Sequence, residues 1–267
     1  MFLKLPLKIV MIGSGNVAHH IMQSLKNNNH ISFIQIFNHR KTNKVQALAK
    51  INNCEFISDY SQLNTKADLY FICVKDDVIS DVVKTLSSIK LKGLVVHTSG
   101  STDLLALKNT SPNIGVYYPL QSFSYSDVIN WKQTPILIEA NTKKSEVILK
   151  SIAKSISGSV KLVNSSTRLQ FHLAAVFACN FTNALYDVAF RLIEQKLSKK
   201  DTQLLLPIMT QAFHKIKTLS PKKAQTGPAM RNDVLVMKKH LELLKSNKQL
   251  TMVYNLLSEL IVKQQKT

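Results

Sequence analysis

A short apolar segment, a glycine-containing turn and a helical pattern follow one another at the start of the chain. Residues 8–12 are strand-like, and residues 13–18 read Gly-Ser-Gly-Asn-Val-Ala. In this G-x-G-x-x-A spacing, Gly13 permits a tight turn, Gly15 lets a ligand approach the backbone, and Ala18 keeps the helix close to the sheet. A strand joined to a helix by such a turn is typical of a βαβ unit, so we expect an α/β domain with a mostly parallel sheet.

The alternation of strand and helix patterns continues to about residue 162 and then stops. Further strands are expected at residues 31–37, 54–56, 69–74, 94–97, 114–118, 135–139 and 159–162. Helices are expected between them at residues 16–26, 42–51, 78–88 and 146–156. Later segments have only helical periodicity, with helices expected at residues 167–195, from Asp201 to 218, from Pro228 onward and at residues 247–263. We therefore predict a doubly wound Rossmann domain over residues 1–163 and an all-helical domain for substrate binding and dimerisation over residues 164–267.

Composition argues against several other classes of protein. The 35 Lys and Arg residues exceed the 16 Asp and Glu residues, but the lysines are scattered and no aromatic residues interleave with them, so we expect no nucleic-acid partner.

No apolar run approaches the roughly 18 residues that span a bilayer, and residues 1–6 are too short for a secretory leader. A soluble cytoplasmic protein is therefore expected. Its three cysteines form no ligand set with histidines, so we expect no metal site.

The residues after the second strand bear on which ligand the turn receives. Sites specific for NAD carry an acidic residue there to hold the ribose 2′-hydroxyl, whereas this chain has Asn38, His39, Arg40 and Lys41. Arg40 can form two hydrogen bonds to a 2′-phosphate, and Asn38 can bond the ribose. NADP(H) is therefore the predicted cofactor, the alternatives being a structural turn and a solvated arginine. The predicted contacts are Gly13, Ser14, Gly15, Asn16, Val17, Ala18, Asn38, His39, Arg40, Val74 and Lys75.

These motifs resemble those of a known superfamily. Residues 13–18, 38–40 and 74–77 are similar to the β-hydroxyacid dehydrogenase and pyrroline-5-carboxylate reductase superfamily, which includes the 6-phosphogluconate dehydrogenase-like enzymes. The chain more closely resembles bacterial Rossmann-like proteins with a C-terminal domain of unknown function, DUF2520, through residues 97–101, 118–123, 172–183 and 227–233. The resemblance implies an NADP-dependent oxidoreductase with a helical, dimerising C-terminal domain. It names no substrate.

One departure from the superfamily concerns proton transfer. The hydroxyacid dehydrogenases carry a Lys-x-x-x-Asn pair on the first long helix of the second domain. If Asn180 matches that asparagine, Val176 occupies the lysine position. Their lysine general acid is therefore absent, and their chemistry cannot be carried over intact.

Several polar residues are candidates for the proton transfer that the lysine performs in the hydroxyacid dehydrogenases. His172 is the preferred proton donor, because histidine titrates near neutral pH, and Asn180 is expected near the same helix face. His97 and Ser99 belong to the end of another strand and are further catalytic candidates; the alternative role for His97 is a hydrogen bond within its own loop. The predicted substrate contacts are Ser101, Gln121, Asn183 and Arg231. The alternatives are a hydrogen-bonded core or interface role for His172, and a local ion pair with Asp233 for Arg231, with Thr226 as a helix cap.

Together these residues favour an oxidoreductase that transfers a hydride between NADP(H) and a small carbonyl, imine or hydroxy compound, in a cleft between the two domains. A non-catalytic NADP(H) sensor is the alternative, because the lysine is missing. Electron transfer between NADP and a deazaflavin is a third hypothesis and needs a large open second site. The small and apolar residues of the long helix predict a homodimer: Ala174, Ala175, Ala178 and Phe181.

Overall fold

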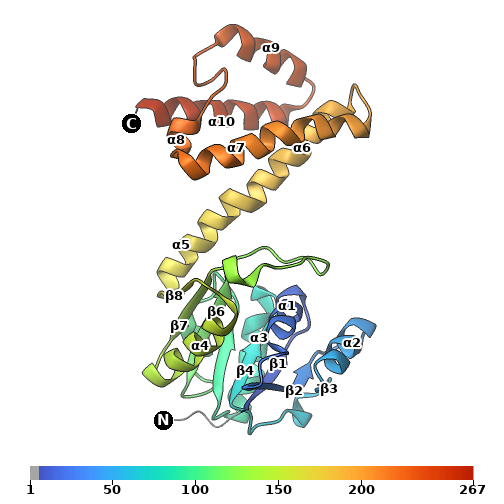
Figure 1. Ribbon diagram of the computed structural model, residues 1–267, viewed down its shortest axis with the longest axis vertical. Coiled ribbons are helices and arrows are strands. Elements are labelled where there is room, and N and C mark those ends of the chain that lie inside the picture. The colour runs from blue at the N-terminus through green and yellow to red at the C-terminus, as the bar shows by residue number, and fades with distance from the viewer. Residues whose placement is uncertain (1–5, 267) are drawn as a thin grey trace. The chain divides into compact units, whose positions relative to one another are not determined.

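The computed structural model describes residues 6–266; residues 1–5, which belong to the segment considered above as a leader, and Thr267 lie outside them. Its core is one eight-stranded sheet (Figure 1). The strands are β1 (Leu7–Ile12), β2 (Ile31–Phe37), β3 (Glu55–Ile57), β4 (Leu69–Ile72), β5 (Leu94–His97), β6 (Ile114–Pro119), β7 (Ile136–Ala140) and β8 (Val160–Leu162). Their order is β3-β2-β1-β4-β5-β6-β7-β8, and only β6 and β7 pair antiparallel. The predicted α/β Rossmann fold is thus confirmed.

Helices cover both faces of this sheet. They are α1 (Asn16–Leu25), α2 (Asn43–Ile51), α3 (Ile79–Ile89) and α4 (Lys143–Ile156), with short 3₁₀ turns η1 (Tyr60–Gln62), η2 (Asp76–Val78), η3 (Leu104–Leu107) and η4 (Trp131–Gln133). Successive strand residues point to opposite faces, so Ile9 and Met11 pack with α1, α2 and α4, whereas Val10 and Ile12 pack with α3 and η3. Each fully buried side chain of this size contributes about 1.5–3 kcal/mol to stability. Burial on two faces explains why the central strands are almost wholly apolar.

Side-chain caps set the starts of two of these helices. The Thr142 hydroxyl accepts the backbone N–H of Ser145, so α4 begins at Lys143, earlier than the predicted residue 146. Thr42 caps α2 in the same way through Val45. A threonine oxygen that accepts a first-turn N–H replaces a hydrogen bond that the helix itself cannot make.

The remainder of the chain is helical. It contains α5 (Ser165–Ala175), the π-helix η5 (Val176–Phe181), α6 (Thr182–Glu194), the 3₁₀-helix η6 (Lys199–Leu205), α7 (Leu206–Thr218), α8 (Pro221–Ala224), α9 (Val234–Leu244) and α10 (Lys248–Lys266). By compactness the chain divides into two units, one ending at Ala184 and the other beginning at Leu185. The first unit extends past the last strand because the start of α5 bonds to the sheet. The domain boundary between residues 163 and 164 remains a prediction.

Two expected helix starts in this part were wrong. α9 begins at Val234 and not at Pro228, because the Asp233 carboxylate accepts the backbone N–H of Val236 and caps the helix, which Thr226 does not. The segment expected as one helix from Asp201 is instead the 3₁₀-helix η6, which begins at Lys199, followed by α7. Ser198 is the N-cap of η6, and the Ser198 and Asp201 side chains form a capping box, with Asp201 at its third position.

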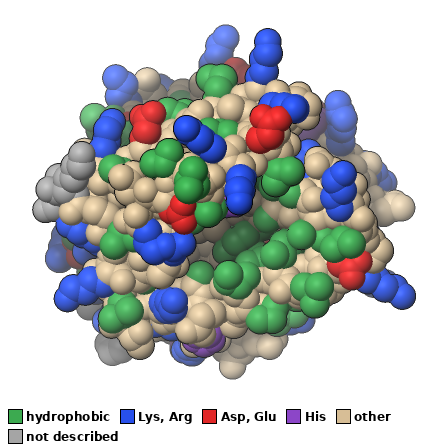
Figure 2. Space-filling model, turned by 90° about the horizontal axis from the view of Figure 1, so that it is seen from above, with side chains coloured by type: hydrophobic (Ala, Val, Ile, Leu, Met, Phe, Trp, Pro, Cys, Tyr) green, Lys and Arg blue, Asp and Glu red, His purple; other side chains and the backbone are tan. Residues whose placement is uncertain are grey.

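The surface bears on two expectations about partners. Lys and Arg side chains are dispersed over the face shown in Figure 2, in line with the scattered lysines of the sequence. By length and composition one helix among the described residues, Ser165–Glu194, is apolar enough to cross a membrane, although no long uninterrupted apolar run marks it in the sequence. That helix carries Arg168, His172 and an Asp187–Arg191 ion pair. Length and composition alone are weak evidence for a membrane span, because core helices of soluble proteins share them.

Candidate active site

The glycine turn after β1 is built to receive an anion. Gly13 has a φ of +104°, and a Cβ there would lie 2.3 Å from the Cys73 carbonyl oxygen, so only glycine fits. At Gly15 a Cβ would meet no atom within 4 Å, so the space beside its backbone is open. Gly15 is also the N-cap of α1, and no side chain bonds to the first N–H groups of that helix. Free amide groups, the positive end of a helix and open space beside them suit a pyrophosphate.

The end of β2 is equally suited to a phosphate. The Asn38 side-chain amide donates to the Arg40 carbonyl oxygen at 2.7 Å and thereby fixes the loop. Arg40, Lys41 and the neighbouring His39 are exposed, and neither cation forms an ion pair with any described residue. After β4, Val74 is half-buried and Lys75 is exposed. Uncompensated cations at this strand end fit the 2′-phosphate of NADP(H).

Hydroxyl groups and a carboxylate gather at the neighbouring strand ends. The Ser99 and Ser101 hydroxyls both donate to the Asp76 carboxylate, at 2.7 and 2.5 Å. The Ser99 oxygen also accepts the backbone N–H groups of Ser101 and Thr102. Ser99 is therefore fully engaged and fixed in place. Asp76 belongs to residues 74–77, which carry part of the superfamily resemblance, but no sequence pattern indicated that it bonds to Ser99 and Ser101.

His97 lies beneath this cluster and is fully buried. Its Nδ1 accepts the backbone N–H of Ser99 at 3.2 Å. Burial first, and the nearby Arg168 charge second, lower the pKa of His97 to about 4, so the ring is neutral at neutral pH. This environment favours the loop-supporting alternative for His97, and a catalytic role for it stays a prediction.

Tyr118 and His172 form a pair that the sequence did not reveal. The Tyr118 hydroxyl and His172 Nδ1 are 3.1 Å apart, and the two rings meet edge to face. Gly100 packs against both, because a Cβ there would lie 2.8 Å from His172 Nδ1 and from Tyr118 Cζ. Burial raises the pKa of the Tyr118 phenol, the Asp76 charge adds to the rise, and Arg168 opposes it. The phenol is therefore protonated at neutral pH and hydrogen-bonded to an imidazole.

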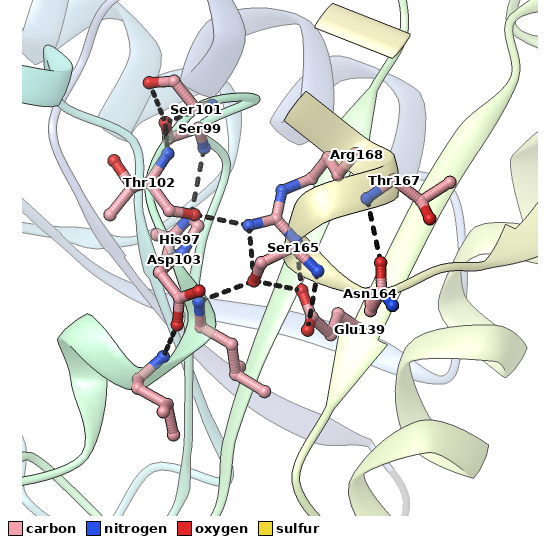
Figure 3. A network of polar contacts seen from close by, with 12 residues as sticks. His97, Ser99, Ser101, Thr102, Asp103, Glu139, Asn164, Ser165, Thr167 and Arg168 are labelled. Atoms are coloured by element: carbon pink, nitrogen blue, oxygen red, sulfur yellow. Dashed lines mark hydrogen bonds and ion pairs between the residues drawn. The ribbon is translucent and has the colours of Figure 1, made fainter. Parts of the chain in front are cut away.

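Arg168 ties the helix that carries His172 to the sheet. Its guanidinium is 1% exposed and forms an ion pair with Glu139 on β7. It also donates to the Thr102 carbonyl and to the Ser165 hydroxyl, while Ser165 bonds to Glu139 (Figure 3). Pairing of its two terminal nitrogens offsets much of the cost of burying the guanidinium, although the Arg168 Nε has no hydrogen-bond partner among the described residues. His172 follows one helical turn later, so this network sets its position.

Comparison with known proteins agrees with this arrangement. Residues 8–99 match the family model described as NADP oxidoreductase, coenzyme F420-dependent, and residues 134–261 match the domain of unknown function DUF2520. A provisionally named NADP oxidoreductase from Bacteroides fragilis is 33% identical, with a TM-score of 0.88, over 96% of this chain and 98% of that chain. The chain belongs to this family of NADP oxidoreductases. NADP(H) is accordingly its cofactor.

More distant structures share the fold of this NADP oxidoreductase. A Thermotoga maritima protein is 22% identical, with a TM-score of 0.71 over 97% of this chain and 100% of that chain. A reductive aminase from Aspergillus terreus is 14% identical, also with a TM-score of 0.71, over 97% of this chain and 94% of that chain. The comparison with curated proteins found no match.

The long helix of this oxidoreductase changes its hydrogen bonding near the position of the absent lysine. Residues Val176–Phe181 form a π-helix, which contains both Val176 and Asn180. Because a π-helix bonds i to i+5, it rotates later residues relative to a regular α-helix, on which the expected shared face of His172 and Asn180 was based. π-helices occur frequently at functional sites. Asn180 and Asn183 are both exposed.

Two further predicted substrate contacts, Gln121 and Arg231, are exposed. Gln121 is exposed, and its side-chain oxygen accepts the backbone N–H of Ser122. Arg231 is exposed in the C-terminal unit, and no ion pair with Asp233 occurs among the described residues. Substrate roles for both remain predictions.

Proposed function

We propose that this protein transfers a hydride between NADP(H) and a small carbonyl, imine or hydroxy compound, with Tyr118 and His172 handling the accompanying proton. The Tyr118–His172 hydrogen bond carries this proposal. β1, β4, β5 and β6 are consecutive in the sheet, so the glycine turn, the Ser99 cluster and Tyr118 share one edge of it. Ligands of open α/β sheets bind at this edge.

The cofactor, when bound, supplies or accepts the hydride. In the reducing direction the Tyr118 hydroxyl donates a proton to the substrate heteroatom, and His172 Nδ1 returns one to the phenol oxygen. In the oxidising direction both transfers reverse. Tyr118 thereby takes the place of the lysine missing at Val176. The Ser101 hydroxyl, held by Asp76, is exposed and its oxygen can still accept a hydrogen bond from a polar group of the substrate, whereas Ser99 holds the loop in place.

Imines and carbonyl compounds are the substrate class to screen first. Fold relatives include the reductive aminase and an imine reductase from Myxococcus stipitatus, solved with NADP+. The alternative, an NADP(H) sensor without catalysis, is favoured only by the absent lysine. The Tyr118–His172 pair provides the proton donor that this alternative assumes to be missing.

Nucleotide binding tests the first part of the proposal. Arg40→Ala should weaken NADPH binding by about 10- to 100-fold, because a charge-assisted contact to the 2′-phosphate contributes about 1.5–3 kcal/mol. NADH binding should change by less than about two-fold, since NADH has no 2′-phosphate. Fluorescence titration of both nucleotides measures this, with Arg191→Ala as a control of equal charge. A wild-type protein that binds neither nucleotide would rule out the proposed function.

We also propose that the protein is a homodimer joined through its helical part. Four large apolar residues recur at four-residue spacing along the long helix and are about half exposed: Leu169, Leu173, Phe177 and Phe181. A second copy of the chain would bury such a stripe. Sedimentation at micromolar concentration should give twice the chain mass, and Leu173→Glu should give monomers. Leu105→Glu, at another exposed leucine, is the control; a monomeric wild type would contradict the proposal.

A further inference from the structure

The loop between β6 and η4, residues 120–130, is tied to the start of α1 (Figure 1). The Asn16 side-chain amide donates to the Phe123 carbonyl oxygen at 2.9 Å, and His20 Nε2 donates to the Ser124 carbonyl oxygen at 2.7 Å. The His20 ring also stacks on Phe123. Asn16 directly follows Gly15, so this loop lies beside the helix turn whose free N–H groups suit the pyrophosphate.

The same loop reaches the next helix through Tyr125. Its ring lies 4.2 Å from the His19 ring, measured between centroids. On α2, the Lys44 ammonium lies 4.9 Å from the centre of the Tyr125 ring. Lys44 is in the first turn of α2, four residues after Arg40. Tyr125 therefore bridges α1 to the segment that begins with the predicted 2′-phosphate contact.

The exposed charged side chains next to Tyr125 on the β2–α2 segment are positive. Arg40, Lys41 and Lys44 are all exposed, and none has a carboxylate partner among residues 6–266. The nearest acid on the loop, Asp127, accepts the Ser124 backbone N–H at 2.6 Å. The start of α2 adds the positive end of its dipole. Three unpaired cations at a helix start suit a doubly charged anion.

We propose that Tyr125 holds Lys44 so that Lys44 and Arg40 together bind the 2′-phosphate of NADP(H), which makes residues 120–130 a specificity-determining part of the cofactor site. This inference rests on the proposed function. A lysine side chain is flexible and loses conformational entropy when it binds a phosphate. A cation–π contact that already restricts the ammonium reduces this loss. Tyr125 thus acts on the cofactor through Lys44, as a positioning residue.

Binding of NADPH and of NADH to four variants of the full chain tests the proposal. Lys44→Gln should weaken NADPH binding by about ten-fold. Tyr125→Ala should weaken it by about three- to five-fold, because this change in affinity corresponds to the energy of one exposed cation–π contact. NADH binding should change by less than about two-fold in both. Tyr125→Phe keeps the ring and should bind like the wild type. Lys50→Gln, in the last turn of α2, is the charge-matched control.

The double variant separates positioning from a general effect. If Tyr125 acts through Lys44, Tyr125→Ala should add nothing to the loss already caused by Lys44→Gln. Circular dichroism and thermal denaturation confirm folding of each variant. Unchanged NADPH binding in Tyr125→Ala, or an equal loss for NADH, would overturn the inference and leave the proposed function intact. A wild-type protein that binds neither nucleotide would overturn both.

Discussion

Gly15→Val should weaken NADPH binding by at least about 100-fold and leave the free energy of unfolding within about 1 kcal/mol of the wild-type value. A Cβ added at Gly15 would meet no neighbouring atom within 4 Å, so the space beside this backbone is open and we expect the folded chain to accommodate a side chain there. The same space is needed for close approach of the pyrophosphate to the backbone. Fluorescence titration gives the affinity, and urea denaturation gives the stability.

Gly13→Ala is the matched comparison, because it affects the other glycine of the turn in the opposite way. Gly13 has a φ of +104°, and its Cβ would overlap the Cys73 carbonyl oxygen. We expect this variant to lose about 2–4 kcal/mol of stability through strain. If Gly15→Val bound NADPH normally, the turn could not be the phosphate site.

Tyr118→Phe should lower the rate of NADPH-dependent reduction by about 10²–10⁴-fold, the usual contribution of a general acid. His172→Ala should cause a loss of similar size, and the double variant should lose little more than either single variant, because the two side chains act as one unit. NADPH affinity should stay within about two-fold, since neither residue belongs to the predicted cofactor contacts. The rate is measured as NADPH oxidation with the best imine or carbonyl substrate of a screen.

The pH profile provides a second measurement of the same pair. Burial raises the pKa of the Tyr118 phenol above its ordinary value of 10.0, so the proton-donating form persists to higher pH than free tyrosine. The wild-type rate should therefore show no loss from Tyr118 below pH 10, and the alkaline limb should disappear in Tyr118→Phe. Tyr186→Phe, an exposed tyrosine, is the control. An unchanged rate in Tyr118→Phe would exclude this residue as the proton donor.

The amino-acid sequence by itself determined the fold class and the cofactor, NADP(H). The bounds of β2 and β5 were predicted to the residue, since buried parallel strands are short apolar runs with polar ends. The glycine turn and Arg40 were recognisable as candidate cofactor contacts because each belongs to a short pattern of neighbouring residues in the chain. Expected helix starts were less accurate where a cap decided them, as at Thr142 and Asp233.

Only the tertiary structure decided which distant side chains meet. Tyr118 and His172 are 54 residues apart, and Arg168 and Glu139 are 29 apart, so no local pattern joins them. The π-helix that begins at Val176 was also not predictable, because the hydrophobic periodicity used to predict helices assumes a regular α-helix. Such pairs depend on how strands and helices are placed by packing over the whole sheet. Local patterns therefore located the glycine turn, whereas long-range packing brought Tyr118 and His172 together.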